Sequence, residues 1–230
     1  MFAWKKFLIS LVGLLLLISA LLYARNLSYL IPGYHFFVYT PTKYSKTLTE
    51  IRQKKQGKKN ANLTQQQQFL VESLTQKVFP YWYGTRWNFY GTTLTPGEGS
   101  IACGYFVTTT LQAISYPIDR VKLAKCASEK MIRALVQPRY IWHFNGMDLL
   151  PFCSGLLEKG KGLYIIGLDN HTGYLWAKGN GELRFIHSSG RFPFCVINED
   201  ARESVVLRIS RYKVVGKISA DEKFLQHWFE

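Results

Sequence analysis

The residue best suited to covalent chemistry in this sequence is Cys103, which lies in the glycine-rich stretch 97–106 just before the apolar run 107–114. This pattern predicts that a loop delivers Cys103 to the first turn of a buried helix. The backbone N–H groups of that turn have no partner within the helix, and the helix dipole favours negative charge. A thiol placed there is expected to have a lowered pKa and to act as a nucleophile. The alternative is a buried structural cysteine, because free cysteine is among the most buried residue types.

Two histidines further along the chain are candidates for the base that such a nucleophile needs. From about residue 161 the pattern changes to short strands separated by glycines, predicted at 162–168, 171–176, 182–187, 194–197 and 205–209. Residues 178–181 predict a hairpin turn between the second and third of these strands. His171 and His187 would then lie on neighbouring antiparallel strands, with their side chains within reach of each other.

The elements that must position these side chains are helices in the first half of the chain and strands in the second. Helical patterns cover residues 65–78, 103–113 and 121–136; Thr64 is the expected N-cap of the first, and Pro80 is expected to end it. Helices followed by an antiparallel sheet predict an α+β domain.

Composition sets the class of protein. The 230 residues are 47% hydrophobic and 19% charged, which is typical of a globular chain with one full core. The net charge of +14 favours an anionic partner, but no nucleic-acid motif accompanies it, so no nucleic acid is expected. The four cysteines are far apart and no H-E-x-x-H motif is present, which argues against zinc, and neither a metal nor another cofactor is expected. Outside a reducing compartment two of Cys126, Cys153 and Cys195 could pair, and the sequence does not say which.

The N-terminal segment is expected to engage a membrane. Residues 7–23 carry no charge and are mostly apolar, so they predict a transmembrane anchor, with a cleaved signal peptide as the alternative. Lys5 and Lys6 place the N-terminus in the cytoplasm and the domain on the extracytoplasmic side, in the periplasm or at the cell surface. The chain thus divides into an anchor or signal at 1–24, a basic linker with a polar, solvated helix at 25–62, and a domain at 63–230.

The order of these motifs resembles the NlpC-type branch of the papain-like cysteine peptidases, with related CHAP amidases sharing the layout. The nucleophile helix resembles Ala102-Cys103-Gly104 and the aromatic residues after it, and the aromatic-Gly segment before it resembles residues 81–84. The strand pair leading to His-x-Gly is similar to 162–173, and the last histidine segment is similar to 186–189. The resemblance covers residues 80–189 and implies a papain-like fold, with N-terminal helices packed on an antiparallel sheet, and a hydrolase of cell-wall peptides.

The resemblance also implies roles for individual residues. Cys103 would attack an amide carbonyl to form a thioester, His171 would transfer the proton, and His187 would orient His171. The backbone N–H of Cys103 would stabilise the oxyanion, and Gly104 and Tyr83 are further candidates for the oxyanion site or the substrate groove.

Two other functions stay open at this point. The family usually has Asp-Cys-Ser where this chain has Ala102-Cys103-Gly104, so a papain-like domain that has lost its chemistry and binds an anionic wall polymer is the first alternative. A protein acting at the membrane surface through its basic linker is the second. A thioester intermediate also does not separate a hydrolase from an acyltransferase.

Overall fold

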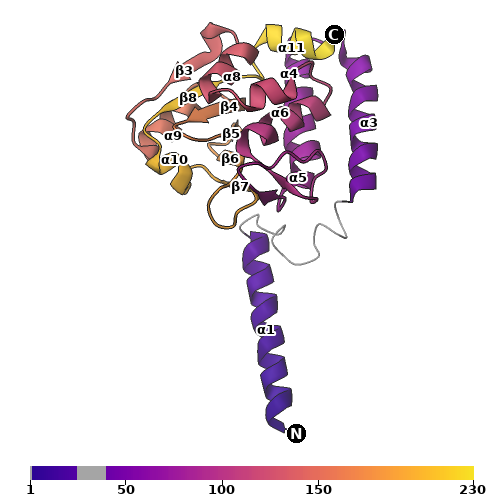
Figure 1. The fold of residues 1–230 in the computed structure, drawn as a ribbon, viewed down its shortest axis with the longest axis vertical. Helices are drawn as coiled ribbons and strands as arrows, with labels where there is room; N and C mark the ends of the chain where they lie inside the picture. The colour runs from indigo at the N-terminus through magenta and orange to yellow at the C-terminus, as the bar shows by residue number, and fades with distance from the viewer. Residues whose placement is uncertain (1, 25–39) are drawn as a thin grey trace.

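A six-stranded antiparallel sheet forms the centre of the domain, with its strands in the order β3-β8-β4-β5-β6-β7 (Figure 1). The computed structural model describes residues 2–24 and 40–230. The strands of this sheet are β3 (Ile141–His143), β4 (Gly162–Leu168), β5 (Thr172–Ala177), β6 (Leu183–Ser188), β7 (Val196–Asp200) and β8 (Lys213–Gly216). A separate parallel pair, β1 (Arg86–Trp87) and β2 (Ser100–Ile101), precedes the helix that carries Cys103. The fold is α+β, as the order of helices and strands predicts.

Helices from both halves of the chain pack around this sheet within residues 40–230 (Figure 1). The helices of the described residues are α1 (Phe2–Ala24), α3 (Pro41–Lys58), α4 (Leu63–Glu72), α5 (Phe79–Trp82), α6 (Cys103–Ala113), α7 (Arg120–Ala124), α8 (Ser128–Leu135), α9 (Leu149–Leu157), α10 (Val205–Ile209) and α11 (Glu222–Phe229). A π-helical turn, Ser73–Val78, joins α4 to α5, and a 3-10 turn, Pro138–Tyr140, leads into β3.

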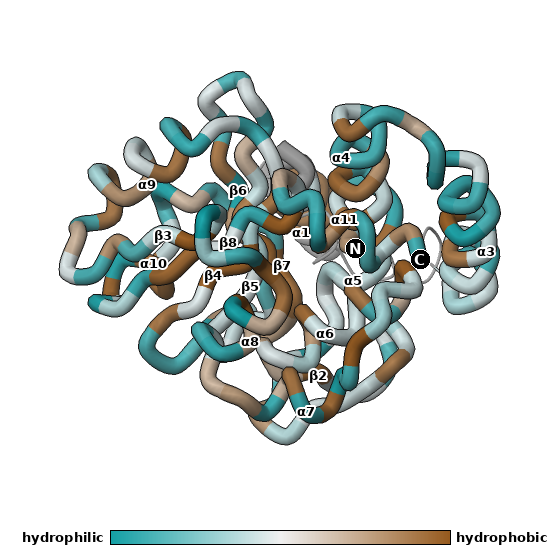
Figure 2. Tube along the Cα trace, turned by 90° about the horizontal axis from the view of Figure 1, so that it is seen from above, coloured by the Kyte–Doolittle hydropathy of each residue, from teal (hydrophilic) through white to brown (hydrophobic). Residues whose placement is uncertain are grey.

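The two faces of the sheet bury two separate cores because successive strand residues point to opposite sides. One face contributes Leu163, Ile165, Tyr174 and Ile186 to the larger core, together with residues of α3, α4, α5, α6, α8 and α11. The other contributes Tyr164, Ile166, Leu175 and Phe185 to a smaller core that α9 and α10 cover. Figure 2 shows the hydrophobic segments gathered on the strands and hydrophilic segments along α3 at the edge of the domain.

Helix α6 begins at Cys103 and ends at Ala113, as the sequence predicts, and it is fixed to the sheet by buried hydroxyl groups. The Tyr174 hydroxyl on β5 donates to the Val107 carbonyl at 3.0 Å and lies 2.9 Å from the Thr110 hydroxyl. Because these groups are buried, breaking the set would leave polar atoms without partners. The end of α6 that carries Cys103 is therefore held in a fixed position relative to β5.

The helical stretch before α6 differs from the prediction at both ends. Asn62, not Thr64, is the N-cap, and its side chain accepts from the Gln65 N–H at 3.0 Å. Pro80 does not end the helical stretch, because it lies within the first two positions of α5. An N–H group at these positions has no partner within the helix, so proline, which lacks one, is tolerated there. The predicted apolar face is confirmed, since Phe69, Leu70, Leu74 and Val78 are buried.

The second half of the chain also departs from the prediction, and its elements β3, α9 and α11 were not expected. The predicted strand at 205–209 is helix α10, whose N-cap Ser204 accepts from the Leu207 N–H. The predicted single helix at 121–136 is two helices, with Cys126 in the turn between them. Strand β8 was not predicted, although it pairs with both β3 and β4 inside the sheet. The hairpin between β5 and β6 is confirmed.

The prediction that the helix at 45–56 is solvated is wrong. Helix α3 buries Tyr44 and Ile51 in the larger core, and the Trp82 indole N–H donates to the Tyr44 hydroxyl at 3.1 Å. The ammonium group of Lys55 donates to the Ser115 carbonyl at 3.4 Å. The sequence does not reveal that α3 packs on the core, because only one residue in each turn points inward and the others are mostly polar or basic.

Helix α1 covers the predicted N-terminal anchor. Its described side chains from Leu8 to Ile18 are apolar apart from Ser10 and Gly13, and the large ones are exposed. Within the described part of the chain, no helix meets the combined length and hydropathy required of a bilayer-spanning segment. Residues 25–39, the first part of the predicted basic linker at 25–62, lie outside the described residues.

Replacement of Ile51 by Ala is expected to destabilise the domain by about 2–5 kcal/mol, because it leaves a cavity under α3. The exposed Lys54→Ala variant on the same helix is the control, with an expected change within about 0.5 kcal/mol. Urea unfolding of the full chain, followed by tryptophan fluorescence, measures both. Equal stability of the two variants would show that α3 does not pack on the core.

Candidate active site

Cys103 is the first residue of α6, and the residue before it leaves the helix N-terminus open. The N-cap Ala102 has no side chain that could bond to the N–H groups of the first turn. The loop before the helix is held in place by the Ala102 N–H, which donates to the Gly91 carbonyl at 2.9 Å, and by the Ser188 hydroxyl, which donates to the Ile101 carbonyl at 2.7 Å. Ser188 is on β6, so this bond ties the cysteine loop to the strand that carries His187.

The glycine after the nucleophile has a structural cause. A Cβ at Gly104 would lie 2.4 Å from the carbonyl oxygen of Ala124, which no side chain can occupy. The backbone at the end of α7 therefore crosses α6 directly beside Cys103. This contact accounts for Gly104, where the family that the sequence resembles usually has a serine.

The two histidines meet as the sequence predicts. The His171 Nε2 lies 2.7 Å from the His187 Nδ1, and the two rings are nearly perpendicular. Gly173 allows this contact, because a Cβ there would lie 2.7 Å from the Cβ of His187. The ring of His187 also stacks on Phe185, with centroids 3.9 Å apart, so its plane is fixed.

A third group, which the sequence did not reveal, continues this chain of hydrogen bonds. The Nε2 of His187 lies 3.1 Å from a carboxylate oxygen of Glu199 on β7. In the register of the sheet Glu199 pairs with Phe185, and it therefore shares a face with His187. The signal that could have revealed it is an acidic residue two positions from the end of a strand next to β6, but the predicted strand ended at residue 197.

The hydrogen-bond chain determines which nitrogen of His171 is free. An ionised carboxylate only accepts hydrogen bonds, so His187 donates to Glu199 from Nε2. The Nδ1 of a neutral His187 then accepts, and His171 donates to it from Nε2. His171 Nδ1 is left without a proton and can accept one from a thiol.

Burial keeps both imidazoles neutral near pH 7. Desolvation lowers the pKa of His171 well below its usual value, and the neighbouring His187 acts in the same direction. Desolvation also lowers the pKa of His187, while the hydrogen bond and charge of Glu199 partly oppose this. A neutral His171 is in the form that a general base requires.

The prediction of a lowered cysteine pKa is wrong. Burial raises the pKa of the Cys103 thiol, and the backbone N–H groups of Thr172, Gly104 and Cys103 itself only partly oppose this effect. Thr172 is the first residue of β5 and follows His171, so its N–H acts on the sulfur from the histidine side. In the described chain no hydrogen bond joins the Cys103 sulfur to His171. The resting site therefore holds a neutral thiol and a neutral imidazole.

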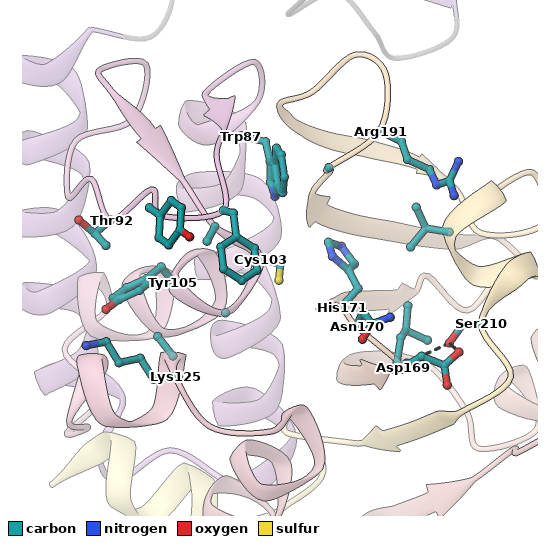
Figure 3. A pocket seen from close by; sticks show the side chains of 18 of the residues that line it. Trp87, Thr92, Cys103, Tyr105, Lys125, Asp169, Asn170, His171, Arg191 and Ser210 are labelled. Carbon is teal, nitrogen blue, oxygen red and sulfur yellow. Dashed lines mark hydrogen bonds between the residues drawn. The ribbon is translucent and has the colours of Figure 1, made fainter.

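Cys103 and His171 line a common cavity of about 820 Å³, in which they lie on facing walls (Figure 3). A second cavity, of about 570 Å³, also includes Cys103, Gly104 and His171 and extends toward Glu129. The thiol and the imidazole thus lie where two cavities meet, so a substrate can extend from the reacting bond in both directions.

The remaining candidates lie elsewhere. Tyr83 does not line either cavity, and its hydroxyl accepts from the Asn198 side chain at 3.1 Å, on the opposite face of the sheet from His187. All four cysteines are free, and Cys153 and Cys195 are buried. Among the described residues, no group of three His, Cys, Asp or Glu side chains is arranged to hold a metal ion.

The loop that carries His171 is fixed by Asp169. Its carboxylate accepts from the Arg211 N–H at 2.8 Å, the Tyr212 N–H at 3.0 Å and the Ser210 hydroxyl at 2.9 Å. These hydrogen bonds lower the pKa of Asp169, the largest contribution coming from the Arg211 N–H. The Asp169 carboxylate thus ties the β4–β5 turn to residues 210–212, which lead directly into β8.

Comparison of the chain with protein-family models, curated proteins and solved structures found no match.

The pH dependence of Cys103 alkylation is expected to follow the raised pKa of its thiol. The rate of Cys103 labelling by iodoacetamide in the full chain should be low at pH 7 and should rise with pH. The midpoint of this rise should lie at a higher pH than for an ordinary thiol, because the reactive thiolate forms only at alkaline pH. Peptide mass spectrometry gives the rate at each cysteine, with the half-buried Cys126 as the internal reference. Fast, pH-independent labelling of Cys103 between pH 6 and 8 would instead indicate a thiolate–imidazolium pair.

Proposed function

We propose that this protein is a papain-like cysteine hydrolase that cleaves an amide bond by way of a thioester at Cys103. The observation that carries the proposal is the hydrogen-bond chain from His171 through His187 to Glu199, which ends at an unprotonated His171 Nδ1 in the cavity that Cys103 lines. This chain leaves a neutral imidazole with a free nitrogen in the same cavity as the thiol, which is the pairing that nucleophilic catalysis by cysteine requires.

The proposed reaction uses each group in turn. The Cys103 sulfur attacks the carbonyl carbon while His171 Nδ1 takes the thiol proton. As the tetrahedral intermediate collapses, His171 returns this proton to the leaving amine, and the thioester remains. Water then attacks the thioester with His171 again accepting a proton, which it gives back to the departing thiolate.

Charge that develops during the reaction is stabilised from two sides. The open N-terminus of α6 offers the Cys103 N–H to the oxyanion, and one such donor contributes on the order of 3 kcal/mol. When His171 becomes cationic, it keeps its hydrogen bond to His187. The Glu199 carboxylate, bound to the other side of His187, stabilises the positive charge.

The proposal places the protein at a membrane, with the domain on the extracytoplasmic side. The exposed apolar side chains of α1, from Leu8 to Ile18, support attachment to lipid. The resemblance to NlpC-type enzymes supports cell-wall peptides as the first substrates to test.

One observation favours a second function, a binding module without catalysis. The Cys103 thiol has a raised pKa and no hydrogen bond to His171, which is the state expected if the chemistry had been lost. The two functions differ in whether any amide turns over at Cys103.

The Cys103→Ala variant is expected to lose all measurable release of amine from a cell-wall tetrapeptide amide and from fluorogenic acyl amides. His171→Ala should lower kcat by about 10²–10⁴, the usual contribution of a general base. Cys153→Ala is the matched control and should keep the parent rate, because Cys153 lies on α9 and lines neither cavity. Turnover that survives in Cys103→Ala would rule out the proposed nucleophile.

A further inference from the structure

Exposed apolar side chains gather at the mouth of the larger cavity. Five of the eleven large apolar side chains that are exposed within residues 40–230 line this cavity or lie next in the chain to a residue that does. We refer to them as the rim: Phe89, Tyr90, Phe192, Val205 and Ile209. Phe89, Tyr90 and Phe192 are 71%, 83% and 85% exposed, which is unusual for aromatic residues on a water-facing surface.

The rim is held by the backbone and is not a loose set of side chains. The Trp87 N–H donates to the Phe194 carbonyl at 2.8 Å, and the Phe89 and Tyr90 rings pack edge to face with centroids 5.1 Å apart. The ring of Trp87 covers Gly190, where a Cβ would lie 3.0 Å from it. The segments on the two sides of the mouth are therefore joined.

The wall beneath the rim is also largely apolar. Trp87, Leu168 and Val206 line the cavity, together with the ring of Tyr105. The Arg120 guanidinium lies 4.7 Å from the centroid of the Tyr105 ring and donates to the Thr109 hydroxyl, which fixes this ring in place. The apolar surface thus continues from the rim to Cys103 itself.

The charged side chains in the cavity are cationic in effect. Lys125 and Arg191 line it, and within the described residues neither side chain has an ion-pair partner. The one acidic residue in the lining, Asp169, already accepts hydrogen bonds from Ser210, Arg211 and Tyr212. An apolar wall with two unpaired cations is complementary to an apolar chain that carries an anionic group.

We propose that this cavity binds the hydrocarbon chain of an anionic acyl amphiphile and presents its carbonyl carbon to Cys103. The inference rests on the proposed function and changes the substrate class that the resemblance implies. Cell-wall peptides are short and polar, and they would leave the rim in water. An acyl chain would cover the rim, while Arg191 and Lys125 hold the anionic group.

The test compares alkylation of Cys103 in the full chain by N-methyl and N-octyl iodoacetamide. In both reactions the sulfur forms a bond to the reagent's methylene carbon and iodide leaves, so only the alkyl group differs. Each methylene removed from water is worth about a fourfold gain in rate constant. We expect the octyl reagent to label Cys103 at least about tenfold faster than the methyl reagent. Equal rate constants would overturn the inference.

Two variants and a control locate the effect. Phe89→Ser and Ile209→Asp should each reduce the octyl-to-methyl ratio at Cys103 severalfold. Leu150→Ser removes a side chain that is exposed on α9 and does not line the cavity, so it should keep the parent ratio. Equal loss in all three variants would show that the octyl preference does not come from the rim.

Protection experiments test the charge and the source of the chain. Monomeric decanoate should slow iodoacetamide labelling of Cys103 more than decyltrimethylammonium does, and an Arg191→Gln/Lys125→Gln double variant should lose this difference. Protection by phosphatidylglycerol vesicles as well as by decanoate would identify a lipid as a source of the chain. Protection by vesicles alone, without an octyl preference, would mean that the rim docks on a membrane surface, and would overturn the acyl pocket.

The two proposals fail separately. If Cys103 shows the octyl preference but no amide turns over, the acyl pocket stands and the hydrolase does not. If amides turn over at Cys103 with no dependence on chain length, the hydrolase stands and the acyl pocket does not.

Discussion

The hydrogen bond between His171 and the buried His187 is the interaction on which the proposed chemistry depends. It forms only if β5 and β6 keep their register, because Gly173 and His187 must face each other across the pair. His171 is the donor in this hydrogen bond only if β7 keeps its register as well, because Glu199 then accepts from His187 Nε2 and leaves His187 Nδ1 as an acceptor. The sheet thus determines which nitrogen of His171 carries the proton. A shift of one residue in β6 would turn His187 to the other face of the sheet, and a shift of one residue in β7 would do the same to Glu199.

The same burial that orders this chain lowers the reactivity of the thiol. Removing Cys103 and the histidines from water favours the neutral forms of all three, and the open helix N-terminus is too weak to reverse this for the thiol. The arrangement therefore suits proton transfer during attack, in which thiolate and imidazolium form together, and does not suit a preformed ion pair. A substrate that excludes the remaining water from the cavity would strengthen the electrostatic contribution of Glu199.

Local signals in the sequence were sufficient for the features that depend on local structure. The glycine-rich loop and the apolar run predicted where α6 begins, and the glycines at 179 and 181 predicted the hairpin that brings His171 and His187 together. Glu199 could not be predicted in this way, because its role depends on the pairing of β6 with β7 and on which face each side chain takes. The raised pKa of Cys103 was missed for a similar reason, since desolvation comes from elements distant in the sequence. Strand β8 lies between β3 and β4, whose paired residues are 71–75 and 45–51 positions upstream. Helix α3 carries so many cations that its one buried stripe was not recognised.

The central claim is that His171 faces Cys103 with an unprotonated Nδ1, and ¹⁵N–¹H correlation spectra of the histidine rings in the full chain at pH 7.5 test it most directly. The account predicts that His171 and His187 both carry their proton on Nε2 and none on Nδ1, and that a Glu199→Leu variant loses this single pattern. A proton on His171 Nδ1 in the parent protein would contradict the account, because the imidazole could then not accept the thiol proton.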